Sequence, residues 1–202
     1  MPITAGQVEE AAARWGLSTI IAPVADRLAA YGDLLLHWNT RLSLTAIRDE
    51  AELIERHLME GVFAAAHHPE AFIALDFGSG TGVPGILIAL CRPEIRLTLA
   101  ESQRKKAAFL QECLRTLQLR ASVHPSRAEL LPVASFDAVW MRAVDRSASM
   151  LPVAASLVAP AGALCLLGTT NPPNGPTLES WQWKTLPLPG AKDRVLHIGR
   201  RP

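Results

Sequence analysis

Four glycines and a proline occur within eleven residues in the stretch LDFGSGTGVPG, which runs from Leu75 to Gly85. Glycine-rich loops of this kind let a bound cofactor lie close to bare backbone. From Gly80 the stretch matches G-x-G-x-x-G, a pattern typical of loops that bind dinucleotides. Glu101 follows at the end of the next apolar segment, where a carboxylate can accept hydrogen bonds from ribose hydroxyls. On this interpretation the chain is an NAD-dependent oxidoreductase.

From Asp76 the same loop matches a second pattern, D-x-G-x-G-x-G, which is typical of class I S-adenosylmethionine-dependent methyltransferases. Pro84 falls where the following helix begins, and it has no N–H to donate to a pyrophosphate. S-adenosylmethionine has no pyrophosphate, so the proline suits it better. The chain also lacks a persuasive tyrosine–lysine pair for hydride transfer, because its one tyrosine, Tyr31, lies far upstream. The loop therefore favours the methyl donor and leaves the dinucleotide as the alternative.

The first seventy residues have the spacing of amphipathic helices. Apolar residues recur every three or four positions, as at Ile20, Val24, Leu28, Tyr31, Leu35 and Trp38. A further helix is predicted to begin at Asp49, because Glu52 follows three residues later in a capping-box pattern, and to end at Pro69. We therefore expect an N-terminal helical extension over residues 1–70.

From residue 71 onward, short apolar segments alternate with helical ones. Strands are predicted at residues 71–77, 95–101, 120–125, 135–143 and 162–169. Helices are predicted between them at residues 84–93, 102–119 and 145–158. This alternation predicts an α/β fold with a mainly parallel sheet and helices on both faces. Residues 181–188 and 194–201 alternate with period two, which predicts a terminal antiparallel hairpin.

The composition limits which partners the protein can have and where in the cell we expect it. The 202 residues carry a net charge of +1, so a nucleic acid would have to meet a local basic patch. The three cysteines are far apart and form no C-x-x-C pair, which predicts free thiols and no metal site. The N-terminus lacks the pattern of a signal peptide, and the longest apolar run is too short to span a bilayer. We expect a cytoplasmic protein without a membrane segment.

Six motifs occur in a characteristic order along the chain. They are WNTRLSLTAI (38–47), RHLMEGVF (56–63), LDFGSGTGVPGI (75–86), LTLAESQRKKAAFL (97–110), SRAELL (126–131) and MRAV (141–144). Together they resemble the bacterial 16S ribosomal RNA guanine-N7 methyltransferases, the glucose-inhibited division protein B family, over about residues 20–170. The resemblance implies a Rossmann-like class I methyltransferase domain over residues 71–202, packed with the helical extension as one compact unit.

The resemblance also implies a reaction and its participants. A methyl group would pass from S-adenosylmethionine, leaving S-adenosylhomocysteine, to N7 of a guanine in the decoding-centre loop of 16S ribosomal RNA. The partner would be that RNA or the small ribosomal subunit, and the protein would act as a monomer. Because N7 carries its own accessible lone pair, we expect no general base. Catalysis would then consist mainly of placing the base against the methyl group.

Particular residues take roles by the same resemblance. The cofactor would be held by Asp76, Gly78, Ser79, Gly80, Gly82, Val83, Glu101, Ala128, Glu129 and Arg142. Arg142 would also position the target base. RNA contacts are expected from Arg41, His57, Arg104, Lys105 and Lys106; the last three form a cluster at a helix start, where cations oppose the helix dipole.

The chain departs from residues that are common in this family. It has Ser43 where Asn is common, Glu60–Gly61 for Asp-Ser, Val83 for Phe, and Leu167–Gly168 for Lys-Gly. The last change removes a cation beside the expected cleft. A divergent RNA- or ribosome-binding protein with this fold and an altered substrate therefore stays open as a third interpretation.

Overall fold

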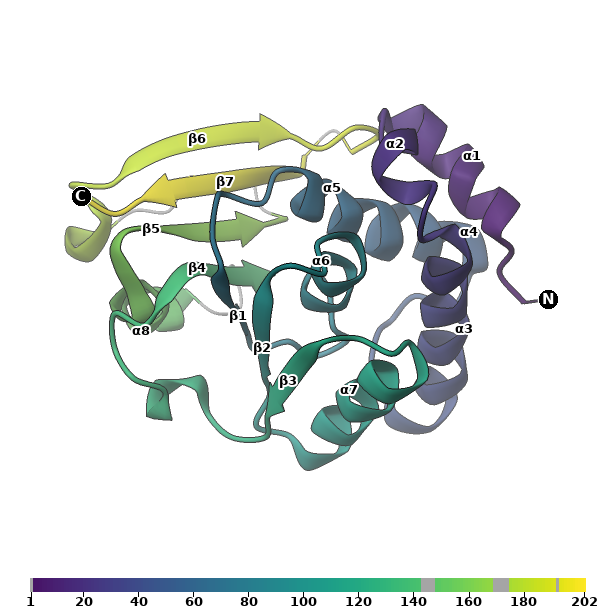
Figure 1. Ribbon diagram of the computed structural model, residues 1–202, viewed down its shortest axis with the longest axis horizontal. Helices are drawn as coiled ribbons and strands as arrows, with labels where there is room; N and C mark the ends of the chain where they lie inside the picture. The colour runs from purple at the N-terminus through teal and green to yellow at the C-terminus, as the bar shows by residue number, and fades with distance from the viewer. Residues whose placement is uncertain (1, 143–147, 169–174, 192) are drawn as a thin grey trace.

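The computed structural model describes residues 2–142, 148–168, 175–191 and 193–202 and contains a seven-stranded sheet flanked by helices (Figure 1). The N-terminal helices are α1 (Ala5–Trp15), α2 (Ser18–Ile21), α3 (Ala25–Leu42), α4 (Glu50–Leu53) and α5 (Glu60–Ala66), with a π-helical segment η1 (Ile54–Met59) joining the last two. The later helices are α6 (Gly85–Cys91), α7 (Arg104–Thr116) and α8 (Leu151–Leu157), with short 3-10 segments η2 (Ala128–Leu130), η4 (Ala148–Met150) and η5 (Pro176–Leu178). The predicted helices are found with two differences: residues 22–24 separate α2 from α3, and the helix predicted from Asp49 contains the π-helical segment η1. The start of the helix predicted at 145–158 lies outside the described residues.

The strands occur close to where the sequence predicted them, except that the fifth begins at Val158, four residues before the predicted start at 162. They are β1 (Ile73–Phe77), β2 (Arg96–Ala100), β3 (Ala121–His124), β4 (Phe136–Arg142), β5 (Val158–Leu167), β6 (Gln182–Pro187) and β7 (Val195–Arg200). Their order in the sheet is β3-β2-β1-β4-β5-β7-β6, in which β1 to β5 run parallel and β7 runs antiparallel to both of its neighbours. The strand order reverses between β1 and β4, and sheets of this kind bind ligands at such a point, outside the carboxyl ends of the strands.

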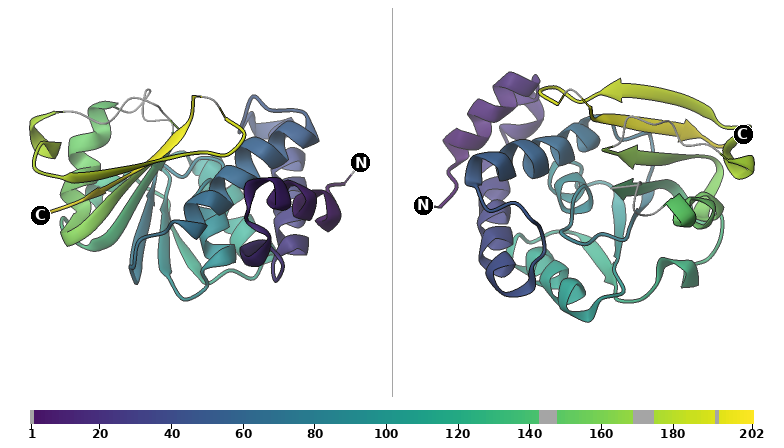
Figure 2. Two further views of the ribbon diagram at one scale, coloured as in Figure 1. Left: turned by 90° about the horizontal axis from the view of Figure 1, so that it is seen from above. Right: turned by 180° about the vertical axis from the view of Figure 1, so that it is seen from behind.

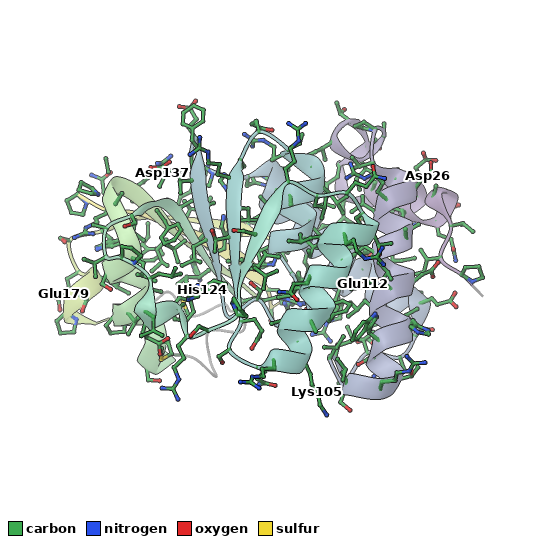
Figure 3. All side chains as sticks on the ribbon, turned by 60° about the horizontal axis from the view of Figure 1, so that its bottom comes forward. Asp26, Lys105, Glu112, His124, Asp137 and Glu179 are labelled. Atoms are coloured by element: carbon green, nitrogen blue, oxygen red, sulfur yellow. The ribbon has the colours of Figure 1, made fainter. Side chains whose placement is uncertain are left out.

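The carboxyl ends of the central strands meet at one edge of the sheet. Phe77 pairs with Ala100, and Asp76 pairs with Trp140 two residues before the end of β4. Figure 3 separates the two edges: Asp137, near the start of β4, lies at one, while His124, which ends β3, lies toward the other. The glycine loop and the end of β4 are therefore brought together at the carboxyl edge.

The sheet is buried on both faces, as parallel sheets are. Ala138 and Trp140 belong to a large core with α6, α7 and the N-terminal helices, whereas the intervening Val139 and Met141 belong to a smaller core with α8. Figure 2 shows α8 on one side of the sheet and the other helices opposite. Among the described residues, no helix is long and apolar enough to cross a membrane.

The N-terminal helices share the large core with the sheet. Asp49 caps α4 as predicted, with its side chain accepting a hydrogen bond from the Glu52 N–H at 2.8 Å. The Tyr31 hydroxyl, fully buried on α3, donates to the Thr81 carbonyl oxygen in the glycine loop at 2.6 Å. Helix α5 packs on α6 so closely that a Cβ added to Gly61 would lie 2.6 Å from Leu87 Cγ. A family-typical serine would not fit at Gly61 without movement.

We predict that Gly61→Ala destabilises the protein by about 1–3 kcal/mol, because the added methyl group overpacks the contact with Leu87. Gly6→Ala is the matched control. It also lies in a helix, but nothing lies within 4 Å of its added Cβ, so its helix propensity should raise stability by about 0.5–1 kcal/mol. Urea unfolding of both variants measures the difference. Equal effects of the two substitutions would contradict the close approach of α5 to α6.

Candidate active site

The glycine loop owes its sequence to its backbone conformation. Gly78, Gly80 and Gly82 have φ of +69°, +53° and +89°, a region that residues with a Cβ rarely adopt. The loop is tied to the sheet because the Ser79 N–H donates to the Ala100 carbonyl oxygen at 2.9 Å. The pattern D-x-G-x-G-x-G thus encodes a loop that turns at every second residue.

Asp76 faces the start of helix α6. Its side chain is 1% exposed and accepts a hydrogen bond from the Gly85 N–H at 3.3 Å. A Cβ on Gly85 would lie 2.5 Å from the Asp76 carboxylate, so glycine is required there. Burial raises the pKa of Asp76 to about 7. The geometry assigns Asp76 to holding the loop against α6; direct contact with a cofactor stays a prediction.

A first cavity of about 190 Å³ opens beside the loop. It brings together four of the predicted cofactor residues, Gly78, Glu101, Ala128 and Glu129. The Glu101 carboxylate is held in place, because its two oxygens accept hydrogen bonds from the Gly80 N–H at 3.0 Å and the Gln103 N–H at 2.7 Å. Of the other predicted cofactor residues, Ser79 and Val83 have buried side chains, and neither they nor Gly82 line this cavity.

A second cavity of about 690 Å³ lies on the other side of the loop, which contributes Thr81 to its wall. It is lined by Ser43, Leu44, Thr45, Ala46, Arg48, Arg56, His57, Thr81, Lys106, Arg142, Gly168 and Arg194. This lining contains arginines and a lysine and, among the described residues, no carboxylate. Such a cavity is suited to anionic or acceptor-rich groups.

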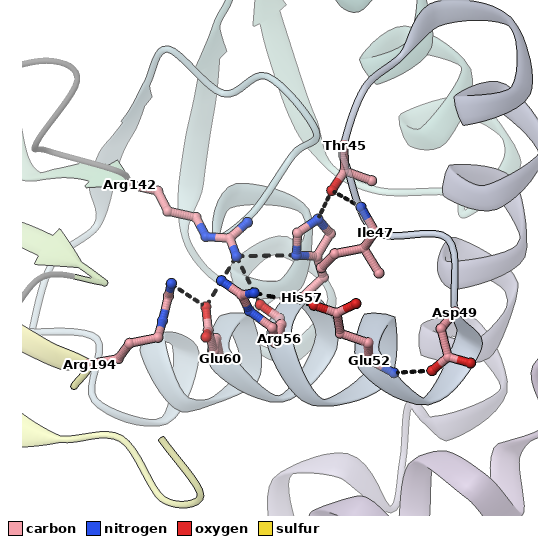
Figure 4. A network of polar contacts seen from close by, with 9 residues as sticks. All are labelled: Thr45, Ile47, Asp49, Glu52, Arg56, His57, Glu60, Arg142 and Arg194. Atoms are coloured by element: carbon pink, nitrogen blue, oxygen red, sulfur yellow. Dashed lines mark hydrogen bonds and ion pairs between the residues drawn. The ribbon is translucent and has the colours of Figure 1, made fainter. Parts of the chain in front are cut away.

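A buried carboxylate fixes two of these arginines. Glu60 is 1% exposed, and its Oε2 accepts hydrogen bonds from Arg142 Nη2 at 3.1 Å and Arg194 Nη2 at 2.8 Å (Figure 4). Arg142 ends β4, and Arg194 directly precedes β7. Arg194 also lies over Gly168, with its guanidinium 2.8 Å from the position that a Cβ there would occupy. Leu167 is fully buried, so at the end of β5 the cation comes from Arg194.

His57 lies between Arg142 and the N-terminal segment. It belongs to the π-helical segment η1 and is 5% exposed. Its Nδ1 lies 3.1 Å from Arg142 Nη2 and its Nε2 lies 3.1 Å from Thr45 Oγ1 (Figure 4). Burial, and then repulsion by Arg142, lowers the pKa of His57 to about 3. His57 is therefore neutral at physiological pH, and both of its nitrogens are engaged within the protein.

The predicted RNA contacts divide into two groups. His57 and Lys106 line the second cavity beside Arg142, whereas Arg41, Arg104 and Lys105 are exposed and lie outside its lining. Lys105 projects outward from the start of α7 (Figure 3). Their contact with RNA stays a prediction.

Three residues of the second cavity network escaped sequence reasoning, namely Thr45, Glu60 and Arg194. The motifs WNTRLSLTAI and RHLMEGVF contain the first two, but neither motif indicates that Thr45 contacts His57 or that Glu60 pairs with Arg142. A signal for Arg194 was present in the hairpin. Because β5 and β7 pair through Leu167 and Leu196, a residue just before β7 must lie at the carboxyl edge of β5.

Comparison with known proteins decides the family. A family model described as rRNA small subunit methyltransferase G matches residues 25–173. The chain belongs to this family. The ribosomal RNA small subunit methyltransferase G of Halorhodospira halophila is 40% identical over 147 residues, which are 72% of this chain and 70% of that protein. The one from Xanthomonas euvesicatoria pv. vesicatoria is 39% identical over 153 residues, 75% of this chain and 72% of that protein.

Solved structures agree with the methyltransferase G family at the level of the fold. A SAM-dependent methyltransferase from Aquifex aeolicus superposes with a TM-score of 0.61 at 14% identity and covers 79% of this chain and 97% of that one. The S-adenosylmethionine-dependent methyltransferase SibL gives 0.58 at 16% identity, covering 96% and 77%. The resemblance to the guanine-N7 methyltransferase family and the α/β methyltransferase fold are both confirmed.

We predict that Asp76→Asn raises stability more at pH 8 than at pH 5. The folded protein keeps a proton on Asp76 up to pH 7, whereas the unfolded chain loses it near its ordinary pKa of 3.8. Raising the pH through this window therefore destabilises the wild type, by on the order of 2 kcal/mol between pH 5 and 8. The uncharged variant escapes that loss. Thermal unfolding at both pH values measures it, with the exposed Asp26→Asn as control; an identical gain at pH 5 and pH 8 would be the contrary result.

Proposed function

We propose that the protein transfers the methyl group of S-adenosylmethionine to N7 of a guanine in the decoding-centre loop of 16S ribosomal RNA. Membership of the rRNA small subunit methyltransferase G family supports the reaction and the class of substrate. The observation that carries the proposal is the pair of cavities on either side of the glycine loop. One is lined by Glu101, whose carboxylate can accept hydrogen bonds from ribose hydroxyls. The other is lined by arginines and a lysine.

The first cavity fits the adenosine part of this cofactor. Glu101 would accept from the ribose hydroxyls, because hydrogen bonds from Gly80 and Gln103 already fix its orientation. Ala128 and Glu129 would flank the adenine, and Gly78 would leave room for the amino-acid end. When bound, S-adenosylmethionine supplies a methyl group on a cationic sulfur, which becomes the neutral thioether of S-adenosylhomocysteine once the N7 lone pair takes the methyl group.

The second cavity fits the RNA side. Arg48, Arg56 and Lys106 would contact phosphates, which position nucleic acids without reading their sequence. Arg142 would hold the target base next to the glycine loop. With a pKa of about 3, His57 cannot accept a proton at neutral pH, which agrees with a reaction that needs no base. Placement alone can supply about 7–11 kcal/mol of a barrier in favourable cases.

The proposal extends to where the protein works and with what. The target would be 16S ribosomal RNA itself or the small ribosomal subunit, met in the cytoplasm by a monomer.

We predict that Glu101→Gln weakens S-adenosylmethionine binding about 10- to 100-fold, because each charged hydrogen bond contributes about 1.5–3 kcal/mol. Isothermal calorimetry with S-adenosylmethionine and with NAD makes the measurement. The control is Glu112→Gln on α7, which lies outside the lining of both cavities and should bind like the wild type. Tight binding of NAD without binding of the methyl donor would instead support the dinucleotide interpretation.

We predict that Arg142→Ala lowers single-turnover methylation about 100-fold or more at saturating RNA, because the base is no longer positioned. The substrate is the small ribosomal subunit lacking the modification, and primer extension or mass spectrometry locates the methylated guanine. Arg96→Ala is the control, since Arg96 is exposed at the opposite edge of the sheet. Unchanged single-turnover rates would refute the role of Arg142. RNA binding by the wild type without methyl transfer would refute the proposed activity and support a binding protein.

A further inference from the structure

Thr45 is held by two hydrogen bonds in the wall of the second cavity. Its Oγ1 accepts from the Ile47 N–H at 3.2 Å and lies 3.1 Å from His57 Nε2 (Figure 4). It is half-buried and lies between the end of α3 and the start of α4.

The direction of the hydrogen bonds follows from Arg142. A guanidinium only donates and offers no lone pair, so its contact with His57 Nδ1 is a hydrogen bond only if that nitrogen carries a lone pair. The same Nη2 has two protons, and they are shared between His57 Nδ1, the Arg56 carbonyl oxygen at 2.8 Å and Glu60 Oε2 at 3.1 Å. A neutral imidazole with Nδ1 as acceptor carries its proton on Nε2. In this tautomer His57 donates to Thr45.

The hydroxyl of Thr45 is thereby left with one proton that it can donate. Both of its lone pairs are engaged, by the Ile47 N–H and by His57 Nε2–H. A hydroxyl has one proton to donate, and within the described residues no acceptor for it is found. Thr45 can act on a ligand in the cavity only as a donor. Ser43 also lines this cavity, but no bond in the described structure fixes the direction of its hydroxyl.

We propose that Thr45 donates a hydrogen bond to O6 of the target guanine and thereby selects guanine over adenine. This inference rests on the proposed function. Beside N7, guanine presents the acceptor O6, whereas adenine presents an N6 amino donor. A hydroxyl that can only donate forms a hydrogen bond with guanine O6. Against the adenine N6 amino group, which is also a donor, it finds no acceptor. A neutral donor also suits the product better than a cation would, because methylation of N7 leaves positive charge on the ring.

The first test measures the tautomer of His57 without any substrate. Two-dimensional ¹⁵N–¹H spectra of histidine-labelled protein distinguish protonated from unprotonated ring nitrogens. The expected result is an Nε2-protonated neutral ring for His57 at pH 7, identified as the signal that His57→Gln removes. A proton on Nδ1 would make Thr45 the donor to His57 and would overturn the proposal.

The second test combines variants of Thr45 with two substrate RNAs. Ribosomal RNA is ligated with either guanine or 2-aminopurine at the methylated position; 2-aminopurine keeps N7 and lacks O6. For the wild type, loss of O6 should lower single-turnover methylation about 10- to 100-fold, because the Thr45 proton is left without an acceptor. Thr45→Val should lower the methylation rate on guanine by a similar factor. Replacing guanine by 2-aminopurine should then lower the rate of this variant by less than about twofold more. Thr45→Ser, which keeps the hydroxyl, should stay within about threefold of the wild type on both.

Controls separate this inference from the function beneath it. Thr116→Val, an exposed residue on α7, should behave like the wild type on both RNAs. If Thr45→Val and the loss of O6 lower the rate by independent, multiplicative factors, Thr45 does not contact O6 and the inference fails alone. If the wild type methylates neither RNA, the proposed function fails and the O6 assignment fails with it. Thermal unfolding and cofactor binding of each variant show that a lost rate is not lost folding.

Discussion

The buried carboxylate of Glu60 is the contact on which the arrangement of the second cavity depends. It is 1% exposed, and a charge in that position is tolerated only when it is paired. Its partners are distant in sequence, since Arg142 ends β4 and Arg194 precedes β7. One carboxylate thus fixes the N-terminal helices, the centre of the sheet and the terminal hairpin to one another. Breaking such a pair typically costs about 3–5 kcal/mol, because a buried charge is left without its counter-ion.

The same cluster sets the charge of the cavity. Two guanidinium groups face one carboxylate, so the cluster keeps a net positive charge that Arg48 and Lys106 increase, whereas Arg56 pairs with Glu52. The overall charge of the protein is only +1, so this positive region is local. It also fixes Arg142, because the Arg56 carbonyl oxygen, His57 Nδ1 and Glu60 Oε2 share the two protons of its Nη2. Electrostatics and hydrogen-bond direction in this cavity therefore have one origin.

Much of the fold could be predicted from the sequence because it follows from local patterns. Helical and strand periodicity located the elements, and the glycines at 78, 80 and 82 anticipated positive φ in the loop. Among the residues that line the first cavity, Glu101 could be assigned from its place at a strand end, and the family resemblance assigned Gly78, Ala128 and Glu129. The roles of Thr45, Glu60 and Arg194 could not, because each depends on a partner brought near only by tertiary packing. No spacing along the chain encodes a contact between residues 60 and 194.

The departures from common family residues have physical counterparts. Gly61 lies too close to Leu87 for a side chain, and Arg194 supplies a cation next to Gly168, where the preceding Leu167 is buried. Ser43 has a φ of +48°, a conformation that asparagine adopts more readily than serine does. The position therefore keeps its backbone shape with a less suitable residue. Both cavities are present in the structure with these residues in place.

The hydrogen bond from Tyr31 to the Thr81 carbonyl oxygen has a further consequence. The glycine loop forms part of the wall of both cavities, and its outer side is held by a helix from the N-terminal region. The sequence pattern therefore changes near residue 70, but the helices before this point and the sheet after it do not form two independent units. The sheet and its glycine loop without the N-terminal helices would lack the Tyr31 hydroxyl that holds the loop. The N-terminal helices are therefore part of the framework that holds the glycine loop.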